Sequence, residues 1–115
     1  MKPVHGQDLQ AFMPGRLSAA AETPRALYVY SPLCGTCRLA ERMLALLEQS
    51  YPQLQIASVN VLEAAELVQA HRIESVPCLM LWGDETPGRD NRPEKVYAFH
   101  SVTYMYERLK GGGLL

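Results

Sequence analysis

Two cysteines, Cys34 and Cys37, stand where a strand pattern gives way to a helix pattern. The residues before them, Ala26-Leu27-Tyr28-Val29-Tyr30, form a compact apolar and aromatic run, which predicts a buried strand. Residues 36–50 carry apolar side chains at helical spacing, contain neither Pro nor Gly, and end shortly before Pro52. They predict a helix. The sequence therefore places both cysteines at the junction between a buried strand and a helix.

The other segments continue an alternation of helices and strands. We predict a short first helix at Gln7–Leu17, into which Pro14 and Gly15 cut. The remaining predictions are strands at 54–61, 78–82 and 95–99, helices at 63–71 and 101–110, an exposed loop at 83–92 and a flexible tail at 111–115. Strand–helix–strand alternation predicts parallel pairing, and the direct connection between the last two strands predicts an antiparallel hairpin. The sequence thus predicts one α/β domain over residues 1–110, with a mixed central β-sheet flanked by α-helices.

Composition and charge exclude several classes of protein. The 115 residues are the size of one domain, and 11 basic against 12 acidic residues give a formal net charge of −1, without the basic excess that nucleic-acid binding needs. No apolar run approaches the ~18 residues of a membrane span, and the first ten residues lack the apolar stretch of a secretory signal. Three cysteines are too few for a disulfide scaffold. We therefore expect no nucleic-acid or membrane partner and a cytoplasmic location.

The spacing of Cys34 and Cys37 favours redox chemistry. Residues three apart on a helix share one face, so the two sulfurs can approach to disulfide distance. A helix N-terminus favours an anion, so the pKa of Cys34 should fall below its usual ~8.5 and Cys34 should be the attacking thiol. Cys37 lies deeper in the helix and would resolve the mixed disulfide. Gly35 leaves room for another backbone to approach closely.

Two other interpretations of this pair stay open. A purely structural disulfide would contribute only about 2 kcal/mol across so small a loop. A metal site needs four ligands as a rule, but the chain has no second C-x-x-C, and His5, His71 and His100 lie far apart in the sequence. A Cys-based metal site is therefore the weaker hypothesis, and we predict no metal and no bound cofactor.

A second motif, Val76-Pro77, stands directly before the predicted strand at 78–82. By itself, a proline at this position is common at the start of a strand and indicates no function. Together with Leu33-Cys34-Gly35-Thr36-Cys37, in one α/β chain of this length, it resembles the active site of the thioredoxin family. The resemblance covers nearly the whole chain, from the first predicted helix to the last. It implies a thioredoxin fold in which Pro77 is cis and packs beside the two cysteines, and in which Val76 offers its backbone to an extended substrate.

Several positions depart from the pattern of that family. Leu33 stands where thioredoxins have Trp, Thr36 where they have Pro, and Tyr97 near a Gly that lines the substrate groove. Tyr28 stands where they have a buried Asp that assists proton transfer, and a tyrosine hydroxyl with its pKa of ~10 is no efficient base near neutral pH. We expect Thr36 to shift the reduction potential upward, because its hydroxyl can stabilise the dithiol. Cys78 takes the place of Thr after the proline, and we expect it to be buried, with an accessory thiol as the alternative.

The resemblance implies a thiol–disulfide oxidoreductase that reduces protein disulfides through Cys34 and Cys37. Its expected substrate-binding residues are Leu33, Gly35, Thr36, Val76 and Pro77. Its expected partners are disulfide-containing proteins and a separate reductase as electron donor, because the chain has no Gly-rich nucleotide-binding motif. The departures at Leu33 and Tyr28 motivate a different hypothesis, an adaptor of thioredoxin fold that binds partners without turnover.

Overall fold

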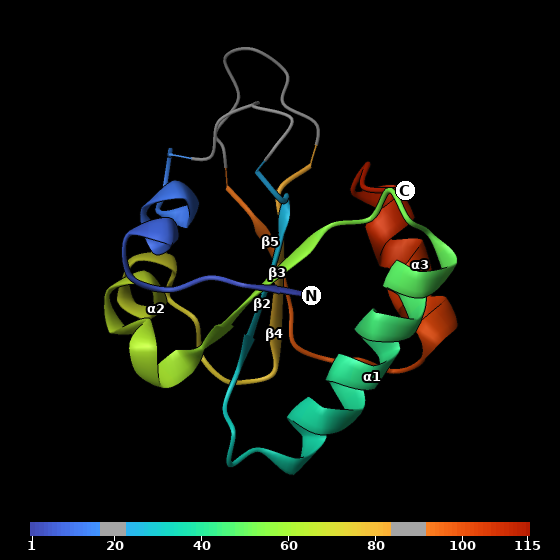
Figure 1. Ribbon diagram of the computed structural model, residues 1–115, viewed down its shortest axis with the longest axis horizontal. Helices are drawn as coiled ribbons and strands as arrows, with labels where there is room; N and C mark the ends of the chain where they lie inside the picture. The colour runs from blue at the N-terminus through green and yellow to red at the C-terminus, as the bar shows by residue number, and fades with distance from the viewer. Residues whose placement is uncertain (17–22, 84–91) are drawn as a thin grey trace.

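A five-stranded mixed sheet runs through the centre of the computed structural model, which describes residues 1–16, 23–83 and 92–115 (Figure 1). The order of the strands across the sheet is β1-β3-β2-β4-β5. β3 pairs in parallel with β1 and β2, whereas β4 pairs antiparallel with β2 and β5. The strands are β1 Lys2–Pro3, β2 Ala26–Tyr30, β3 Ile56–Asn60, β4 Cys78–Leu81 and β5 Glu94–Val96. The predicted parallel crossover and the predicted antiparallel hairpin are confirmed.

Helices cover both faces of the sheet. α1 and α3 lie on one face, and α2 and the 3-10 helix η1 lie on the other (Figure 1). Residues along a strand alternate between the two faces, so β2 turns Leu27 and Val29 toward η1 and α2, and turns Ala26 and Tyr28 toward α1 and α3. Each face thus has its own buried core. The helical segments are η1 Gly6–Phe12, α1 Gly35–Ser50, η2 Val61–Glu63, α2 Ala65–His71 and α3 Val102–Gly111.

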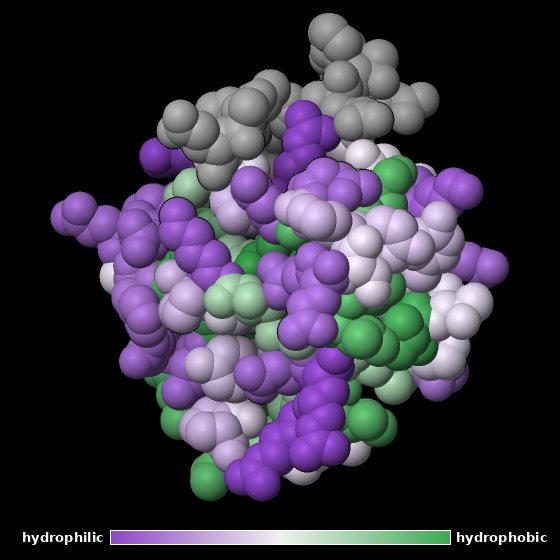
Figure 2. Space-filling view, turned by 45° about the vertical axis from the view of Figure 1, so that its right-hand side comes forward, coloured by the Kyte–Doolittle hydropathy of each residue, from purple (hydrophilic) through white to green (hydrophobic). Residues whose placement is uncertain are grey.

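α1 is the longest helix, and it begins where the two cysteines predict it to begin. Its inner face buries Cys37, Ala40, Leu44 and Leu47, which lie three or four residues apart and so share one face. The outer surface on this side of the molecule is largely hydrophilic, with hydrophobic side chains scattered over it (Figure 2). Burial of the inner stripe therefore fixes the rotation of α1 on the sheet, and with it the direction in which Cys37 points.

The predicted first helix, Gln7–Leu17, is wrong in type and in extent. The structure has a 3-10 helix at Gly6–Phe12 instead, and Leu17 lies outside the described residues. Gly15 adopts a φ of +74°, a left-handed backbone that cannot continue a right-handed helix, and Pro14 has no N–H to donate. Strand β1 was not predicted, because two residues are too few to show an alternating pattern. The predicted loop at 83–92 falls mostly on residues 84–91, which also lie outside the described part.

The remaining predicted elements are present with shifted ends. The strand expected at 54–61 covers 56–60 and passes into η2, and the helix expected at 63–71 begins at residue 65. The strand expected at 95–99 covers 94–96. Among the described residues, no helix is both long enough and apolar enough to cross a membrane.

The end of the chain, which we expect to be a flexible tail, lies against the core in the structure. α3 extends to Gly111, and the N–H of Leu114 donates a hydrogen bond to the carbonyl of Leu109 at 3.0 Å. Leu114 and Leu115 are partly buried and pack against the core beneath α1 and α3. The flexibility expected of residues 111–115 stays a prediction.

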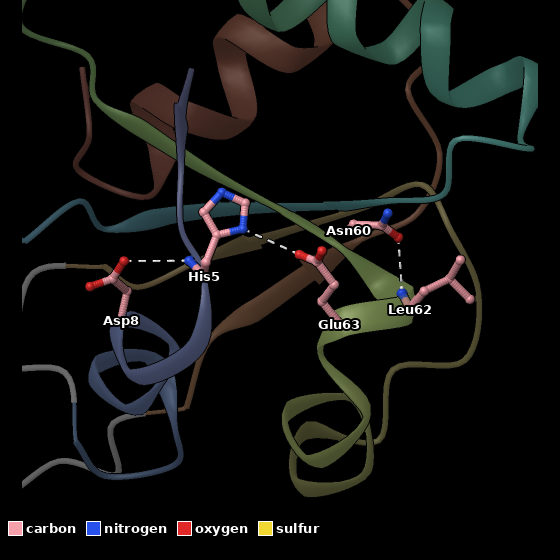
Figure 3. Close-up of polar contacts among 5 residues, drawn as sticks. All are labelled: His5, Asp8, Asn60, Leu62 and Glu63. Carbon is pink, nitrogen blue, oxygen red and sulfur yellow. Dashed lines mark hydrogen bonds and ion pairs between the residues drawn. The ribbon is translucent and has the colours of Figure 1, made fainter.

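The segment after β1 packs beside the end of β3 (Figure 3). His5 Nδ1 lies 3.2 Å from Glu63 Oε2, and the N–H of His5 donates to the Asp8 carboxylate at 3.4 Å. Asn60 Oδ1 accepts a hydrogen bond from the N–H of Leu62 at 3.0 Å and so caps η2. The Leu62 side chain points away from these polar contacts and is 71% exposed. η2 thus presents an apolar side chain to solvent directly after a central strand.

Candidate functional site

Cys34 and Cys37 lie together at the start of α1, at one end of the sheet (Figure 1). The turn that leads from β2 is closed by a hydrogen bond from the N–H of Cys34 to the carbonyl of Ser31 at 3.1 Å. Cys34 is the N-cap of the helix, and its Sγ accepts a hydrogen bond from the N–H of Cys37 at 3.2 Å. This contact satisfies one of the free N–H groups of the first helical turn. Both cysteines are free thiols in this structure.

The surroundings of the Cys34 sulfur stabilise its thiolate. Besides the Cys37 N–H, the hydroxyl of Thr36 lies 3.3 Å from Cys34 Sγ and can donate to it. The pKa of Cys34 lies below its ordinary value, first because of the Cys37 side chain and then because of the Thr36 side chain, and the backbone N–H groups of both residues add to the effect. Because the thiolate is the nucleophilic form, Cys34 has the chemistry expected of the attacking thiol.

Cys37 has the opposite environment. Its side chain is only 2% exposed, and this burial is the main reason why the pKa of Cys37 is raised above its ordinary value. A thiol in the buried position is protected from outside reagents, whereas Cys34 is partly exposed. The two cysteines therefore differ in the way that an attacking thiol and a resolving thiol must differ.

Val76 and Pro77 lie beside the cysteine pair although they follow it by about forty residues in the sequence. The peptide bond between them is cis, the isomer that the family resemblance implies. The carbonyl oxygen of Val76 lies 4.0 Å from Cys34 Sγ, and both residues are partly buried. The fold thus brings together the two motifs that the sequence places apart.

The other expected substrate-binding residues surround Cys34 on the open side. Leu33 is 91% exposed, and Gly35 and Thr36 are exposed. A side chain added at Gly35 would meet nothing within 4 Å, so no neighbour within the protein requires a glycine there. An approaching backbone would find this surface free. Their role in binding stays a prediction.

Leu62 belongs to the same end of the sheet and was missed by the sequence analysis. Tyr30 and Asn60 are register partners at the ends of the parallel strands β2 and β3, so the segments that follow both strands leave the sheet at the same edge. One of these segments carries Leu33 and Cys34, and the other carries Leu62. The predicted parallel pairing could have given the signal, because it places the segments that follow the two strands at the same end of the sheet.

Tyr28 makes a contact with the site that the sequence analysis also missed. Its side chain is fully buried, and its hydroxyl donates a hydrogen bond to the backbone carbonyl of Cys37 at 2.6 Å. Burial is the first cause that raises the pKa of Tyr28, followed by the nearby Cys37. The expectation that Tyr28 is no base is consistent with this direction. Its contact with Cys37 depends on the register between a strand and a helix, which no local pattern encodes.

Cys78 is buried, as expected, but its side chain faces away from α1. It packs in the core beneath η1 and α2, on the opposite face of the sheet from the core that holds Ala40 and Leu44 of α1. Burial raises the pKa of Cys78 to about 11. A role as an accessory thiol stays a prediction, and this position gives it no support.

Tyr97 lies beside the loop that carries Val76. Its hydroxyl accepts a hydrogen bond from the N–H of Glu74 at 3.2 Å, and its ring packs against the core that contains Cys78. This contact holds the segment that precedes Val76 and Pro77. Within residues 1–16, 23–83 and 92–115, no three His, Cys, Asp or Glu side chains gather as ligands for a metal ion.

Removing the Thr36 hydroxyl tests its part in activating Cys34. In Thr36→Val the thiolate loses one donor, so the pKa of Cys34 should rise, and its alkylation rate at pH 7 should fall about threefold, as for one lost hydrogen bond. Iodoacetamide labelling of Cys34, followed by mass spectrometry over a range of pH, measures both values. Thr103→Val, at an exposed position on α3, is the matched control. An unchanged pH profile in Thr36→Val would show that the hydroxyl does not act on the sulfur.

Comparison with known proteins agrees with this geometry. The family model named Thioredoxin matches residues 17–98. The chain is 40% identical over 84 residues to the thioredoxin-like protein YusE of Bacillus subtilis (strain 168), which covers 73% of this chain and 74% of that protein. A disulfide bond formation protein of Brevibacillus choshinensis is 28% identical over 74 residues, or 63% of each chain.

A solved structure shares the fold over nearly its whole length. Thioredoxin from Fasciola hepatica superimposes with a TM-score of 0.69 at 15% identity, over 97% of this chain and 99% of that one. At that identity the likeness concerns the fold alone. The family model covers well over half of the sequence, and the mixed sheet, the flanking helices and the cysteine pair at the start of α1 agree with it. The chain belongs to the thioredoxin family.

Proposed function

We propose that this protein is a thiol–disulfide oxidoreductase that reduces disulfides in other proteins through Cys34 and Cys37. The observation that carries the proposal is the asymmetry of the pair. Cys34 is partly exposed and accepts hydrogen bonds from Cys37 and Thr36, whereas Cys37 is buried one turn into α1. A structural disulfide would not need this difference, and a reaction in two steps does.

The reaction would run by two thiol–disulfide exchanges. The Cys34 thiolate attacks one sulfur of the substrate disulfide, the substrate S–S bond breaks, and the departing sulfur leaves as a thiolate. Cys37 then loses its proton to solvent and attacks Cys34 Sγ, which forms the Cys34–Cys37 disulfide and releases the second substrate sulfur. Two electrons pass to the substrate, whose thiolates take up protons from water. A separate reductase with a dithiol of its own would return two electrons to the pair.

The surface around Cys34 supports a protein substrate. Leu33 and Leu62 are 91% and 71% exposed, and two open leucines at one sheet edge can contact apolar side chains that flank a substrate cysteine. The Val76 carbonyl near Cys34 can accept a hydrogen bond from an extended substrate backbone. We place the activity in the cytoplasm, because thiols are kept reduced there and the pair needs a reducing supply.

Oxidation of other proteins is the second candidate, and two observations favour it. The Thr36 hydroxyl lies 3.3 Å from Cys34 Sγ, and stabilising the Cys34 thiolate stabilises the reduced pair, which makes the disulfide form a stronger oxidant. The relative from Brevibacillus choshinensis carries the name disulfide bond formation protein. The reduction potential of the Cys34–Cys37 pair separates the two directions.

Disulfide reduction in vitro tests the proposal. With dithiothreitol as electron donor, we expect the protein to accelerate insulin reduction about tenfold or more over dithiothreitol alone, because an activated thiolate outcompetes a free thiol. Alkylation of the pair across glutathione buffers gives the reduction potential. An adaptor would retain partners in pull-downs without accelerating reduction. A pair that is reduced by all but the most oxidising buffers, and whose disulfide form oxidises a reduced test protein while becoming reduced itself, would favour the second candidate.

A further inference from the structure

The Tyr28 hydroxyl is a buried polar group in the middle of the central strand β2. The side chain is fully buried, and its ring stacks on Tyr30 with centroids 5.7 Å apart and meets Phe99 edge-on at 6.2 Å. A hydroxyl in such apolar surroundings needs a hydrogen-bond partner, because an unpaired one costs free energy. Its partner therefore indicates what this tyrosine does.

That partner is Cys37. The hydroxyl donates to the Cys37 carbonyl at 2.6 Å, while the N–H of the same residue donates to Cys34 Sγ at 3.2 Å. Cys37 is thus tied at its carbonyl to the sheet and at its N–H to the attacking sulfur. The carbonyl of a residue in the first helical turn already accepts one hydrogen bond within the helix. The bond from Tyr28 is therefore a second hydrogen bond to the same carbonyl, and it joins the helix to the sheet.

Tyr28 can act here only as a donor. Its pKa is raised by burial first, then by the charge of Cys37, and further by Glu41 and Cys34, so the hydroxyl keeps its proton at any pH at which the protein works. The titratable groups around Cys37 are Cys34 from the same turn and Tyr28 from β2, with Glu41 one turn along α1. Burial is the first cause that raises the pKa of Cys37.

We propose that Tyr28 is the positioning residue for the resolving step: its hydroxyl holds the backbone of Cys37 through the carbonyl and so keeps the Cys37 sulfur in place to attack Cys34. The inference rests on the proposed function. Tyr28 is neither oxidised nor deprotonated. The Cys37 proton goes to solvent, the Cys37–Cys34 bond forms, and the bond between Cys34 and the substrate sulfur breaks.

Attack by Cys34 and resolution by Cys37 can be measured as two kinetic phases when the reduced protein reacts with an aromatic disulfide. Reduced protein reacts with 5,5′-dithiobis(2-nitrobenzoate) in a first phase whose rate depends on reagent concentration, when Cys34 attacks. A second phase, independent of reagent concentration, follows when Cys37 displaces the second nitrothiobenzoate. In Tyr28→Phe we expect the second phase to slow about tenfold, because Cys37 loses the hydrogen bond that holds its carbonyl. The first phase should change less than about twofold.

Tyr30→Phe is the matched control. It removes a hydroxyl from the same strand, two residues on and on the same face, and among the described residues the hydrogen bond to the Cys37 carbonyl comes from Tyr28. Thermal unfolding of both variants checks that they are folded. Equal second phases in Tyr28→Phe and wild type, or equal slowing in Tyr30→Phe, would overturn this inference alone. A wild-type protein that never releases the second nitrothiobenzoate would instead overturn the proposed function.

Discussion

Replacing Cys34 by serine is expected to abolish disulfide reduction, with a loss of at least about 1,000-fold. A serine hydroxyl is not ionised near neutral pH and forms no bond to a substrate sulfur that a second thiol could resolve. The fold should survive, since a serine at an N-cap can still accept a hydrogen bond from the Cys37 N–H. Insulin reduction measures the loss, and circular dichroism checks the fold.

Replacing Cys37 by serine should give a different result. Cys34 keeps its hydrogen bonds to the backbone N–H of residue 37 and to Thr36, so it still attacks, but nothing resolves the product. A stable mixed disulfide should then accumulate through Cys34, visible as a mass increase that a reductant removes. A mixed disulfide through residue 37 in the Cys34→Ser variant would show that the two roles are reversed.

Cys78→Ala tests whether the third thiol contributes to the activity of the Cys34–Cys37 pair. The Cys78 side chain lies in the core on the opposite face of the sheet from α1, so activity should stay within about twofold of wild type, apart from any effect of lost stability. If Cys78→Ala loses activity while its unfolding transition is unchanged, the accessory-thiol interpretation gains support.

Local patterns in the sequence were sufficient for the parts of the site that depend on local structure. The strand at 26–30, the helix that follows and the place of Cys34 at its start all come from short-range periodicity and capping. The peptide isomer at Val76–Pro77 came from the family resemblance instead. Such features depend on residues that are neighbours in the chain, or on a known pattern that spans it.

The features that could not be predicted depend on how distant segments meet. The contact from Tyr28 to the Cys37 carbonyl needs both the register of β2 and the rotation of α1, and that rotation is set by Leu44 and Leu47 on the inner face of the helix. The place of Leu62 at the same end of the sheet as Cys34 results from the parallel register of β2 and β3. The prediction of the first helix was wrong for a different reason. Its apolar spacing suits a helix, but Gly15 adopts a left-handed backbone conformation that a right-handed helix cannot contain.

The alternation along β4 explains why burial alone was a poor guide to Cys78. Cys78 and Met80 face η1 and α2, whereas Leu79 and Leu81 face α1 and α3. Cys78 directly follows Pro77, which lies in the site, yet one step along a strand reverses the direction of the side chain. Closeness in sequence to the site therefore says little about which face a thiol occupies.

Leu79→Ala is expected to lower the free energy of unfolding by about 2–5 kcal/mol, the range for truncating a fully buried leucine. Leu79 has no exposed surface and pairs across the sheet with Tyr28 on one side and Val96 on the other. Its loss leaves a cavity in the core beneath α1 and α3 that the surrounding strands cannot close. Urea unfolding at equilibrium measures the change, provided that the slope of the transition stays constant.

Leu62→Ala is the control for this effect, because it removes the same atoms from a side chain that is 71% exposed. We expect its unfolding free energy to change by less than about 0.5 kcal/mol. The two leucines then distinguish the two uses of apolar side chains in this protein. One stabilises the sheet that carries Tyr28, and the other lies open after β3, at the end of the sheet where Cys34 follows β2. An equal loss of stability in both variants would show that Leu62 packs against the protein, and the apolar surface proposed for substrates would then lack one of its two leucines.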